Sequence, residues 1–341
     1  MKDTRFNCLP TIIGSMPHTD PVEVCNLVTR FLKDIPAWPQ LPRRSYKEGM
    51  AIQFGQGFPG IVESEKSIYV DRSLDIDKPL ESLYSAYLDN DVDKYPVGAE
   101  YASGLYEMVS RTDLQPMAIK GQITGPISWG LSVTDENKRA VLYDEILSDA
   151  AARLLRLKAG WQENMLSRLS SETIIFIDEP SMASYGSAFF SLPKDNVIGL
   201  LEEVLGGIKG FSGIHCCGNT DWSLILGTST DILSFDTYNY AESLTLYPAE
   251  VKKYIERGGA IAWGIVPNSE DSLNRETAAS LKERLEEAIA PLTRNGIPFR
   301  QLIEQALITP SCSLSYLSEE ASAHTLELLA DLSVKIRKQY A

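Results

Sequence analysis

The sequence has no long apolar run. None of its apolar segments reaches the about 18 consecutive residues that a membrane-spanning helix needs, so we expect no membrane partner. Residues 1–17 contain a Lys and an Arg but neither an extended apolar core nor a small-residue cleavage site. We therefore expect no signal peptide, and we expect a cytoplasmic protein.

Positive charge and cysteine are also scarce. The sequence has 32 Lys and Arg but 46 Asp and Glu. The resulting formal net charge of −14 would repel the phosphates of a nucleic acid. The five cysteines are an odd number without the spacing of a disulfide framework, so we expect reduced thiols, some of which ligate a metal. These cysteines are Cys8, Cys25, Cys216, Cys217 and Cys312.

Nucleotide-binding motifs are missing as well. No G-x-G-x-x-G and no G-x-x-x-x-G-K follows an apolar run, which weakens any nucleotide-binding interpretation. We find no internal repeat, no low-complexity segment and no domain boundary. The hydrophobic content of 44% is enough for one large core, so we expect a single domain over residues 1–341.

The N-terminal third predicts a β/α unit followed by an insertion. Residues 9–15 have the pattern of a buried strand, and a helix should begin at Asp20-Pro21, an N-cap followed by proline in the first turn. A second strand is expected near 36–42. The rest of the proline- and glycine-rich segment up to residue 62 predicts loops or a small hairpin, and helices are expected at 80–90 and 98–111.

From residue 116 onward strands and helices alternate regularly. This pattern predicts parallel β/α units, and eight strands favour a (β/α)8 TIM barrel over an open doubly wound sheet. Strands are expected at 116–122, 173–180, 211–216, 231–236, 258–267 and 306–309. Helices are expected at 135–169, 194–208, 220–227, 247–257, 270–294 and 318–338, and the residues 124–130 are expected to form a loop.

Potential metal ligands follow two of the expected strands. His215 and Cys217 are two residues apart on an extended chain and therefore point to the same side, whereas Cys216 points elsewhere. Cys312 follows the last strand and reaches the same end of a barrel, where active sites of this fold lie. Three nitrogen and sulfur donors with one exchangeable position are typical of catalytic zinc. Asp236 ends another strand and faces the same opening. A lone cysteine at a strand end is more often a small buried apolar residue, and Cys312 taken alone would be interpreted that way; its occurrence together with His215 and Cys217 favours a metal ligand.

Two adjacent carboxylates end the strand at 173–180. Asp178 and Glu179 alternate across the strand, so one of them should face the site, where it could bind a substrate ammonium group. The alternative for either is a helix-capping or loop-anchoring acid. Ser15 either caps the turn after the first strand or binds a carboxylate. His18 and His324 have no motif partners, and we interpret both as structural or solvated.

Six short motifs, in order along essentially the whole chain, carry a resemblance to a known family. They resemble the C-terminal barrel of cobalamin-independent methionine synthase, which belongs with the uroporphyrinogen decarboxylase-like barrels. The motifs are IIGSMP (12–17), QITGP (122–126), IDEP (177–180), HCCGN (215–219), LSFD (233–236) and TPSCSL (309–314). At this length the chain would be a stand-alone form without the second, N-terminal barrel of the long synthases.

The resemblance implies a zinc ion and homocysteine as methyl acceptor. In the family a His, two Cys and a Glu hold the zinc, and the matching positions are His215, Cys217, Cys312 and Asp236. Asp236 is one methylene shorter than the family's Glu, so it would be a ligand or a hydrogen-bond partner of one. The positions that match the homocysteine site are Ile13, Gly14, Ser15, Glu100 and Asp178.

A departure from the family bears on the methyl donor. The long synthases carry a His after the seventh strand, whereas this sequence reads WGIVPN at 263–268. A methylcorrinoid, either methylcobalamin or a corrinoid protein, is therefore expected as donor in place of methyl-folate. Three alternatives are transfer to coenzyme M, as in the related methylcobamide:coenzyme M methyltransferases, a metal-free decarboxylase of the porphyrinogen type, and a non-catalytic metal or thiol binder.

Overall fold

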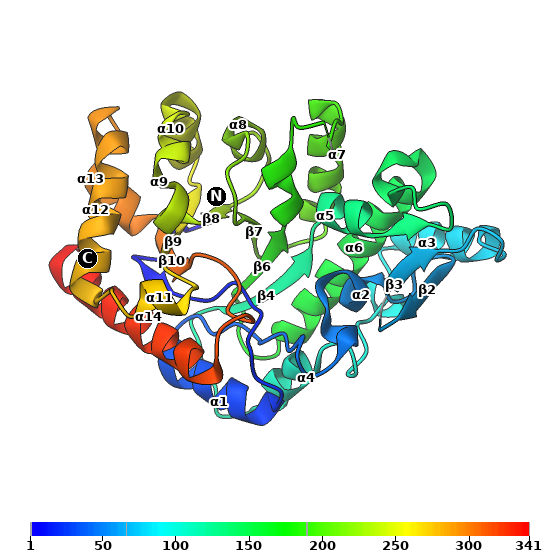
Figure 1. Ribbon diagram of the computed structural model, residues 1–341, viewed down its shortest axis with the longest axis horizontal. Coiled ribbons are helices and arrows are strands. Elements are labelled where there is room, and N and C mark those ends of the chain that lie inside the picture. The colour runs from blue at the N-terminus through cyan, green and yellow to red at the C-terminus, as the bar shows by residue number, and fades with distance from the viewer. Residues whose placement is uncertain (1, 66, 189, 341) are drawn as a thin grey trace.

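The computed structural model describes residues 2–65, 67–188 and 190–340, and a curled parallel sheet forms its centre (Figure 1). Within the described residues seven strands pair side by side, each parallel to its neighbours. In spatial order they are β1 (Leu9–Pro10), β10 (Ala306–Pro310), β9 (Ala260–Val266), β8 (Ile232–Phe235), β7 (Phe211–Cys216), β6 (Thr173–Asp178) and β4 (Ile119–Thr124). The expected alternation of parallel strands and helices is confirmed.

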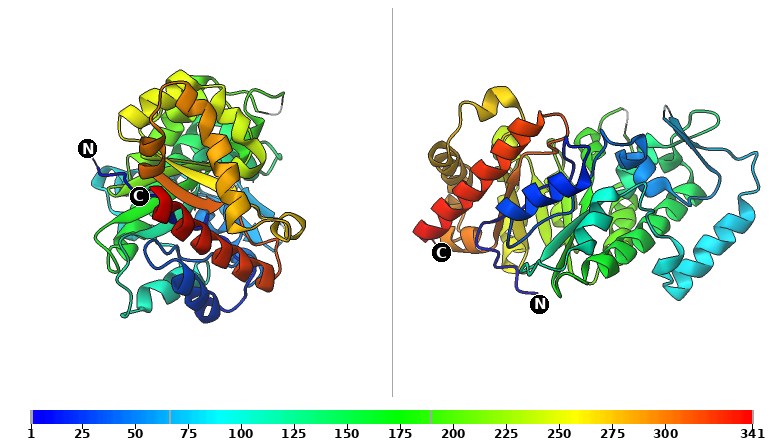
Figure 2. Two further views of the ribbon diagram at one scale, coloured as in Figure 1. Left: turned by 90° about the vertical axis from the view of Figure 1, so that its left-hand side faces the viewer. Right: turned by 90° about the horizontal axis from the view of Figure 1, so that it is seen from below.

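Helices surround the outer side of this sheet (Figures 1 and 2). They are α1 (Pro21–Phe31), α5 (Pro126–Ser132), α6 (Glu145–Leu166), α7 (Lys194–Leu205), α8 (Trp222–Leu226), α9 (Thr237–Thr245), α10 (Pro248–Glu256), α11 (Glu270–Leu273), α12 (Ala278–Arg294), α13 (Phe299–Glu304) and α14 (Glu319–Tyr340). Because helices cover one face and the barrel interior the other, the strands β4, β7, β8, β9 and β10 are buried along their whole length.

An irregular extended segment, residues 34–40, lies between the two edge strands β1 and β4. Ala37 forms an isolated parallel bridge with Lys120 of β4, and Gln40 forms another with Ser15, just beyond β1. Backbone hydrogen bonds from Gln40 to Gly14 and from Met16 to Gln40 support the second bridge. The segment therefore fills the gap in the sheet without being a regular strand.

This arrangement corrects the prediction of eight regular strands. The expected strand at 36–42 has the right place, but Pro36, Pro39 and Pro42 have no N–H with which to donate a ladder hydrogen bond. The fold is consequently TIM-barrel-like, with a curled seven-stranded sheet instead of a closed eight-stranded one.

The expected insertion follows this segment and contains a hairpin. Strands β2 (Ile61–Ser64) and β3 (Ser67–Val70) pair antiparallel, and β5 (Thr134–Asp135) adds to β3 in parallel. Helices α2 (Met50–Gly55), α3 (Asp77–Asp89) and α4 (Ser103–Ser110) complete it. The hairpin and α3 lie at one end of the molecule, away from the middle of the sheet (Figure 1).

The observed helices differ from the expected ones in several places: α9 and α13 were not expected, and the expected helix at 98–111 begins only at Ser103. Three further differences have a clear local cause. The expected loop at 124–130 contains helix α5, which Pro126 begins. The expected helix at 135–169 starts only at Glu145, because Asp144 is its N-cap and accepts hydrogen bonds from two backbone N–H groups. The expected helix at 270–294 is divided into α11 and α12, since Thr277 caps the second part with a capping box.

None of the described helices combines the length and the apolar character that crossing a lipid bilayer requires. The barrel interior is instead filled by side chains at the amino-terminal half of the strands. They include Phe176 of β6, Ile232 of β8, Ala260 and Ala262 of β9 and Leu307 of β10. Because these apolar side chains fill the barrel interior, polar side chains can cluster only at the carboxyl ends of the strands.

Helix α4 packs against the irregular segment through Gly104, and this contact predicts a measurable stability difference. A Cβ at this position would lie 2.0 Å from the carbonyl oxygen of Pro39, which belongs to the backbone and cannot move aside cheaply. We expect Gly104→Ala to lower the free energy of unfolding by about 1–3 kcal/mol.

Gly199 in α7 provides a matched control for this variant. Nothing lies within 4 Å of a Cβ built at Gly199, so Gly199→Ala should raise the free energy of unfolding by up to about 1 kcal/mol through helix propensity. Urea denaturation measures both. Equal stability of the two variants would contradict the close packing of α4 on the segment.

Candidate metal centre

Strand β7 brings His215 to the carboxyl end of the sheet, between β6 and β8. In the strand register His215 lies beside Asp178 of β6 and Ser234 of β8. The imidazole is buried, and its Nδ1 is 2.9 Å from the Ser234 hydroxyl oxygen. Its Nε2 is buried as well and has no hydrogen-bond partner among the described residues. Ser234 thus orients the ring and leaves one nitrogen free to bind a ligand.

Two cysteines lie close to this imidazole. His215, Cys217 and Cys312 each offer one ligand atom, and these atoms lie within 4.8 Å of one another. The Cys312 thiol donates a hydrogen bond to Cys217, and together with His215 it lowers the pKa of Cys217 to about 4 against the effect of burial. The same hydrogen bond, together with burial, raises the pKa of Cys312 well above its usual value. The two shifts have opposite directions, so Cys217 is the thiol of the pair that loses its proton more readily.

The donor set fits a zinc ion. One imidazole nitrogen without a partner and two sulfurs converge from the end of β7 and from the loop after β10, and the pKa of one of these thiols is lowered. Zinc favours such mixed nitrogen and sulfur ligands, and three protein ligands leave a position for a substrate. Cys216 points away, as expected: its buried thiol donates to the Gly218 carbonyl, and burial raises its pKa to about 12.

Asp236, the fourth predicted ligand, lies outside this group. Its carboxylate caps helix α9 and accepts hydrogen bonds from the Asn239 backbone N–H at 2.9 Å and from the Asn239 side chain at 2.7 Å. It is close enough for the charges of Cys217 and His215 to act on its pKa, which burial raises. In this geometry the Asp236 carboxylate is the N-cap of α9 and is not one of the grouped ligand atoms.

The two adjacent carboxylates have different environments. Glu179 caps helix α5 by accepting hydrogen bonds from the N–H groups of Ile127 and Ser128 and from the Ser128 hydroxyl, so it is the helix-capping acid. Asp178 lies beside His215, and its Oδ1 is buried without a hydrogen-bond partner in the described part of the chain. Burial raises the pKa of Asp178 to about 6, although His215 and Lys120 lower it. Asp178 is therefore the carboxylate available to a ligand.

Lys120 is a site residue that sequence reasoning missed. It is fully buried on β4, and its ammonium group donates to the Ile13 carbonyl at 2.7 Å and to Gln122 Oε1 at 3.3 Å. Burial lowers the pKa of Lys120 to about 7, while the negative charge of Asp178 raises it. A lysine within an otherwise apolar strand was the available signal, because a buried cation needs a compensating group.

The loop that follows β1 lies against the loop that carries Cys312. Leu314 donates its backbone N–H to the Ser15 carbonyl at 3.0 Å, and the Ser15 hydroxyl donates to Gln40 Oε1 at 3.2 Å. Gly14 has φ +155°, and a Cβ there would lie 2.5 Å from Gln122 Cδ, so glycine allows the close approach. The predicted substrate residues Ile13, Gly14 and Ser15 are thus adjacent to the metal-ligand loop.

Glu100 is placed differently from the other predicted substrate residues. Its exposed carboxylate forms an ion pair with Lys47 at 2.6 Å, and no contact in the described ranges joins it to His215 or Asp178.

A chain of hydrogen bonds connects the loop after β1 to the insertion. It runs from Ser15 through Gln40 and Gln53 to the backbone carbonyl of Tyr101. The Tyr101 hydroxyl donates to Glu63, whose Oε2 is buried without a partner among the described residues.

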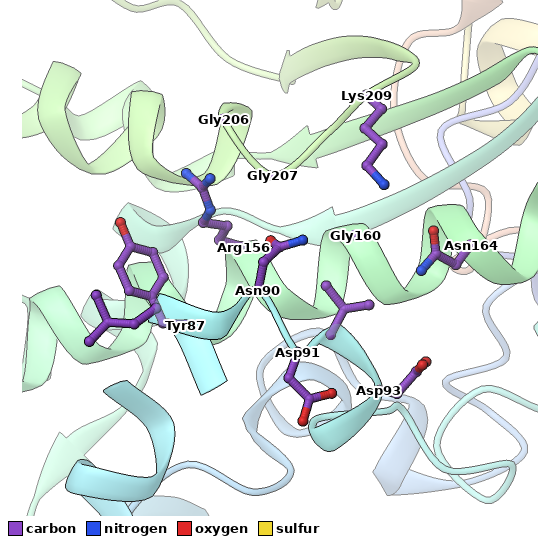
Figure 3. Close-up of a pocket in the computed structure, with 12 residues that line it drawn as sticks. Tyr87, Asn90, Asp91, Asp93, Arg156, Gly160, Asn164, Gly206, Gly207 and Lys209 are labelled. Atoms are coloured by element: carbon purple, nitrogen blue, oxygen red, sulfur yellow. The ribbon is translucent and has the colours of Figure 1, made fainter. Parts of the chain in front are cut away.

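A large cavity lies outside the sheet, between the end of α3, helix α6 and the loop that joins α7 to β7 (Figure 3). Its volume is about 720 Å³, and its lining includes Tyr87, Arg156 and Lys209 but no His or Cys. Lys209 precedes β7, whereas His215 is near the end of that strand, so the length of the strand separates the cavity from the metal-ligand group. The size of this cavity does not make it the candidate site, because active sites of this fold lie at the carboxyl ends of the strands.

Two solved structures share the architecture. One is a B12-independent methionine synthase from Shewanella sp. W3-18-1 in complex with selenomethionine, with a TM-score of 0.58 and 15% identity, covering 97% of this chain and 98% of that one. The chain has the methionine synthase fold. The second, a candidate vitamin-B12 independent methionine synthase from Listeria monocytogenes, has a TM-score of 0.58 and 12% identity and covers 94% and 86% of the two chains.

These likenesses confirm the resemblance inferred from the motifs at the level of the fold. The comparison with family models and the comparison with curated proteins both gave no match. The identities of 15% and 12% are too low to transfer an activity. The chemistry must therefore be argued from the residues of this chain.

The two acids Glu179 and Glu100 should differ in their effect on stability. Glu179→Ala leaves the N–H groups of Ile127 and Ser128 buried without partners, so we expect the free energy of unfolding to fall by about 1–3 kcal/mol. Glu100→Ala removes only a surface ion pair and should cost about 0–1 kcal/mol. Chemical denaturation compares the two, and a smaller loss for Glu179→Ala would contradict its role as a cap.

Proposed function

We propose that the protein is a zinc-dependent methyltransferase that transfers a methyl group to the thiol of homocysteine and forms methionine. The observation that carries this proposal is the meeting of the free His215 Nε2 with the sulfurs of Cys217 and Cys312, next to the unpartnered carboxylate of Asp178. The methionine synthase fold of the chain supports it.

His215, Cys217 and Cys312 would hold the zinc ion. A zinc ion bound there would lower the pKa of a thiol in its open position, so that the thiol reacts as a thiolate at neutral pH. The chain contributes the orientation of these ligands. Ser234 holds the imidazole through Nδ1, and the sulfurs of Cys217 and Cys312 lie close enough to it to bind one ion.

Asp178 and the loop at 13–15 would bind the amino-acid part of the acceptor. The free Oδ1 of Asp178 can accept a hydrogen bond from the ammonium group, which would compensate the buried carboxylate. Lys120 holds the loop in place by donating to the Ile13 carbonyl, and the Ser15 hydroxyl, which donates to Gln40 Oε1 in this structure, would turn to the carboxylate of the amino acid. Holding both ends of the amino acid would place its sulfur in one position, which supplies the proximity that the reaction requires.

Charge at the site favours homocysteine over the alternative acceptors. Coenzyme M carries a sulfonate where homocysteine carries an ammonium and a carboxylate group. It therefore offers Asp178 no cation, and the carboxylate beside His215 would repel the sulfonate. A decarboxylase of the porphyrinogen type would need several cations for its polycarboxylate substrate. Around Asp178 the structure provides Lys120, which is buried and already bound to Ile13.

A methylcorrinoid suits the site better than methyl-folate as donor. When a thiolate attacks the methyl group of a methylcorrinoid, the cobalt–carbon bond breaks and its electron pair stays on cobalt, so no proton is needed. When methyl leaves the nitrogen of a methyl-folate, that nitrogen would need a proton. The end of β9 and the loop after it, residues 263–268, contain no histidine to deliver this proton. Ile265 and Val266 are apolar, and Asn268 donates to the Ser313 carbonyl and accepts from the Ser311 hydroxyl.

Three cysteine variants test the metal centre. Cys217→Ala and Cys312→Ala each remove one of three ligands, so we expect zinc content to fall from about one ion per chain to below a tenth of that. Cys216→Ala is the matched control, because this neighbouring thiol bonds the Gly218 carbonyl instead. Its zinc content should stay at the wild-type level. Zinc retained in both ligand variants would overturn the proposed centre.

An assay with two acceptors and two donors tests the reaction. Methylcobalamin with homocysteine should give methionine at a rate at least tenfold above the rate with coenzyme M, and methyl-folate should give none. Asp178→Asn should raise the KM for homocysteine about tenfold or more while zinc stays bound, because the ammonium loses a charged partner. Tight zinc without methyl transfer from either donor would identify a non-catalytic metal binder instead.

A further inference from the structure

A second group of potential metal ligands lies outside the candidate metal centre. His18, Glu23 and Glu319 each offer one ligand atom, and the three atoms lie within 4.8 Å of one another. His18 belongs to the loop after β1, Glu23 to the first turn of α1, and Glu319 is the first residue of α14. Sequence reasoning gave His18 no partner, because Glu319 is about 300 positions away along the chain.

The group connects the two loops that border the metal centre. His18 is three residues beyond Ser15, and Glu319 is seven residues beyond Cys312. The two helices that carry the glutamates pack side by side, as Figure 2 shows for the blue α1 and the red α14. A ligand bound by all three residues would therefore join these loops at the rim of the barrel.

The imidazole of His18 is buried and only partly satisfied. Its side chain is 3% exposed, and its Nδ1 has no hydrogen-bond partner within the described ranges. Burial lowers the pKa of His18, although the charges of Glu319 and Glu23 raise it. A neutral imidazole beside carboxylates is a competent metal ligand.

The two glutamates lack a cation. Neither Glu23 nor Glu319 forms an ion pair with any described Lys, Arg or His, although their carboxylates come within 4.8 Å of each other. Two negative charges at this separation repel each other. The helix starts on which both residues lie attract carboxylates, and this attraction is the alternative explanation of their positions.

We propose that His18, Glu23 and Glu319 bind a divalent transition-metal ion. One imidazole nitrogen and two carboxylate oxygens form a harder donor set than the sulfur-rich centre, so the site would take an ion such as Mn²⁺ or Fe²⁺, with water in the remaining positions. The bound ion would link the loop after β1 to the start of α14. This proposal is independent of the proposed methyl transfer.

Manganese titration of the zinc-loaded protein tests the site. Mn²⁺ competes poorly for thiolate ligands, and its electron paramagnetic resonance signal reports free ion directly, so we expect one Mn²⁺ bound per chain at micromolar to submillimolar concentration. Glu319→Gln and His18→Gln should each weaken binding at least tenfold. Pulsed measurements should detect an imidazole nitrogen at the bound ion in the wild type and not in His18→Gln.

Glu320→Gln is the matched control, because Glu320 is the next exposed acid on the same helix and is not in the group. It should bind Mn²⁺ like the wild type. Mn²⁺ should also raise the thermal midpoint of the wild type and of Glu320→Gln by several degrees, and leave that of Glu319→Gln unchanged. No binding by the wild type at millimolar Mn²⁺, or equal binding by Glu319→Gln and Glu320→Gln, would overturn the proposal.

Discussion

The register of three adjacent parallel strands determines the composition of the site. Asp178 on β6 pairs with His215 on β7, and His215 pairs with Ser234 on β8. A shift of one residue in either pairing would turn the side chains of a whole strand to the other face of the sheet. The free carboxylate, the oriented imidazole and the hydroxyl that orients it therefore depend on the same ladder of backbone hydrogen bonds.

Two buried ionisable groups beside the site are each accompanied by other polar groups. Lys120 is bound to the Ile13 carbonyl and lies near Asp178, and Glu179 receives the first N–H groups of α5. Such groups would be costly to bury alone. Here they tie the loop after β1 and helix α5 to the carboxyl ends of the strands, so the walls of the site are held by polar contacts as well as by packing.

Much of the fold could be predicted from sequence because the strands are buried on both faces and read as short apolar runs. The strand at 211–216 and the pair His215 and Cys217 follow from such a run and its period of two. The irregular form of the segment at 34–40 could not be predicted from the sequence. Its prolines interrupt the ladder of backbone hydrogen bonds, while isolated bridges to its neighbours still hold the segment in place.

The parts of the site that could not be predicted from the sequence depend on contacts between segments that are far apart in the chain. The helix at 126–132 depends on Glu179, and the place of Asp236 depends on Asn239 as an alternative partner for its carboxylate. Glu100 has the carboxylate expected of a substrate-binding residue, but in the structure this carboxylate pairs with Lys47, which comes from another part of the insertion. Lys120 was visible in the sequence as a lysine in an apolar strand, yet its partners were not.

The closeness of the Cys217 and Cys312 sulfurs has a consequence for the handling of the protein. A thiolate next to a thiol is the arrangement from which a disulfide forms most readily once an oxidant is present. Without a bound ion, air would convert the two sulfurs to an oxidised form that cannot ligate metal. The apoprotein should therefore lose its capacity for zinc during storage, and a reductant should restore it.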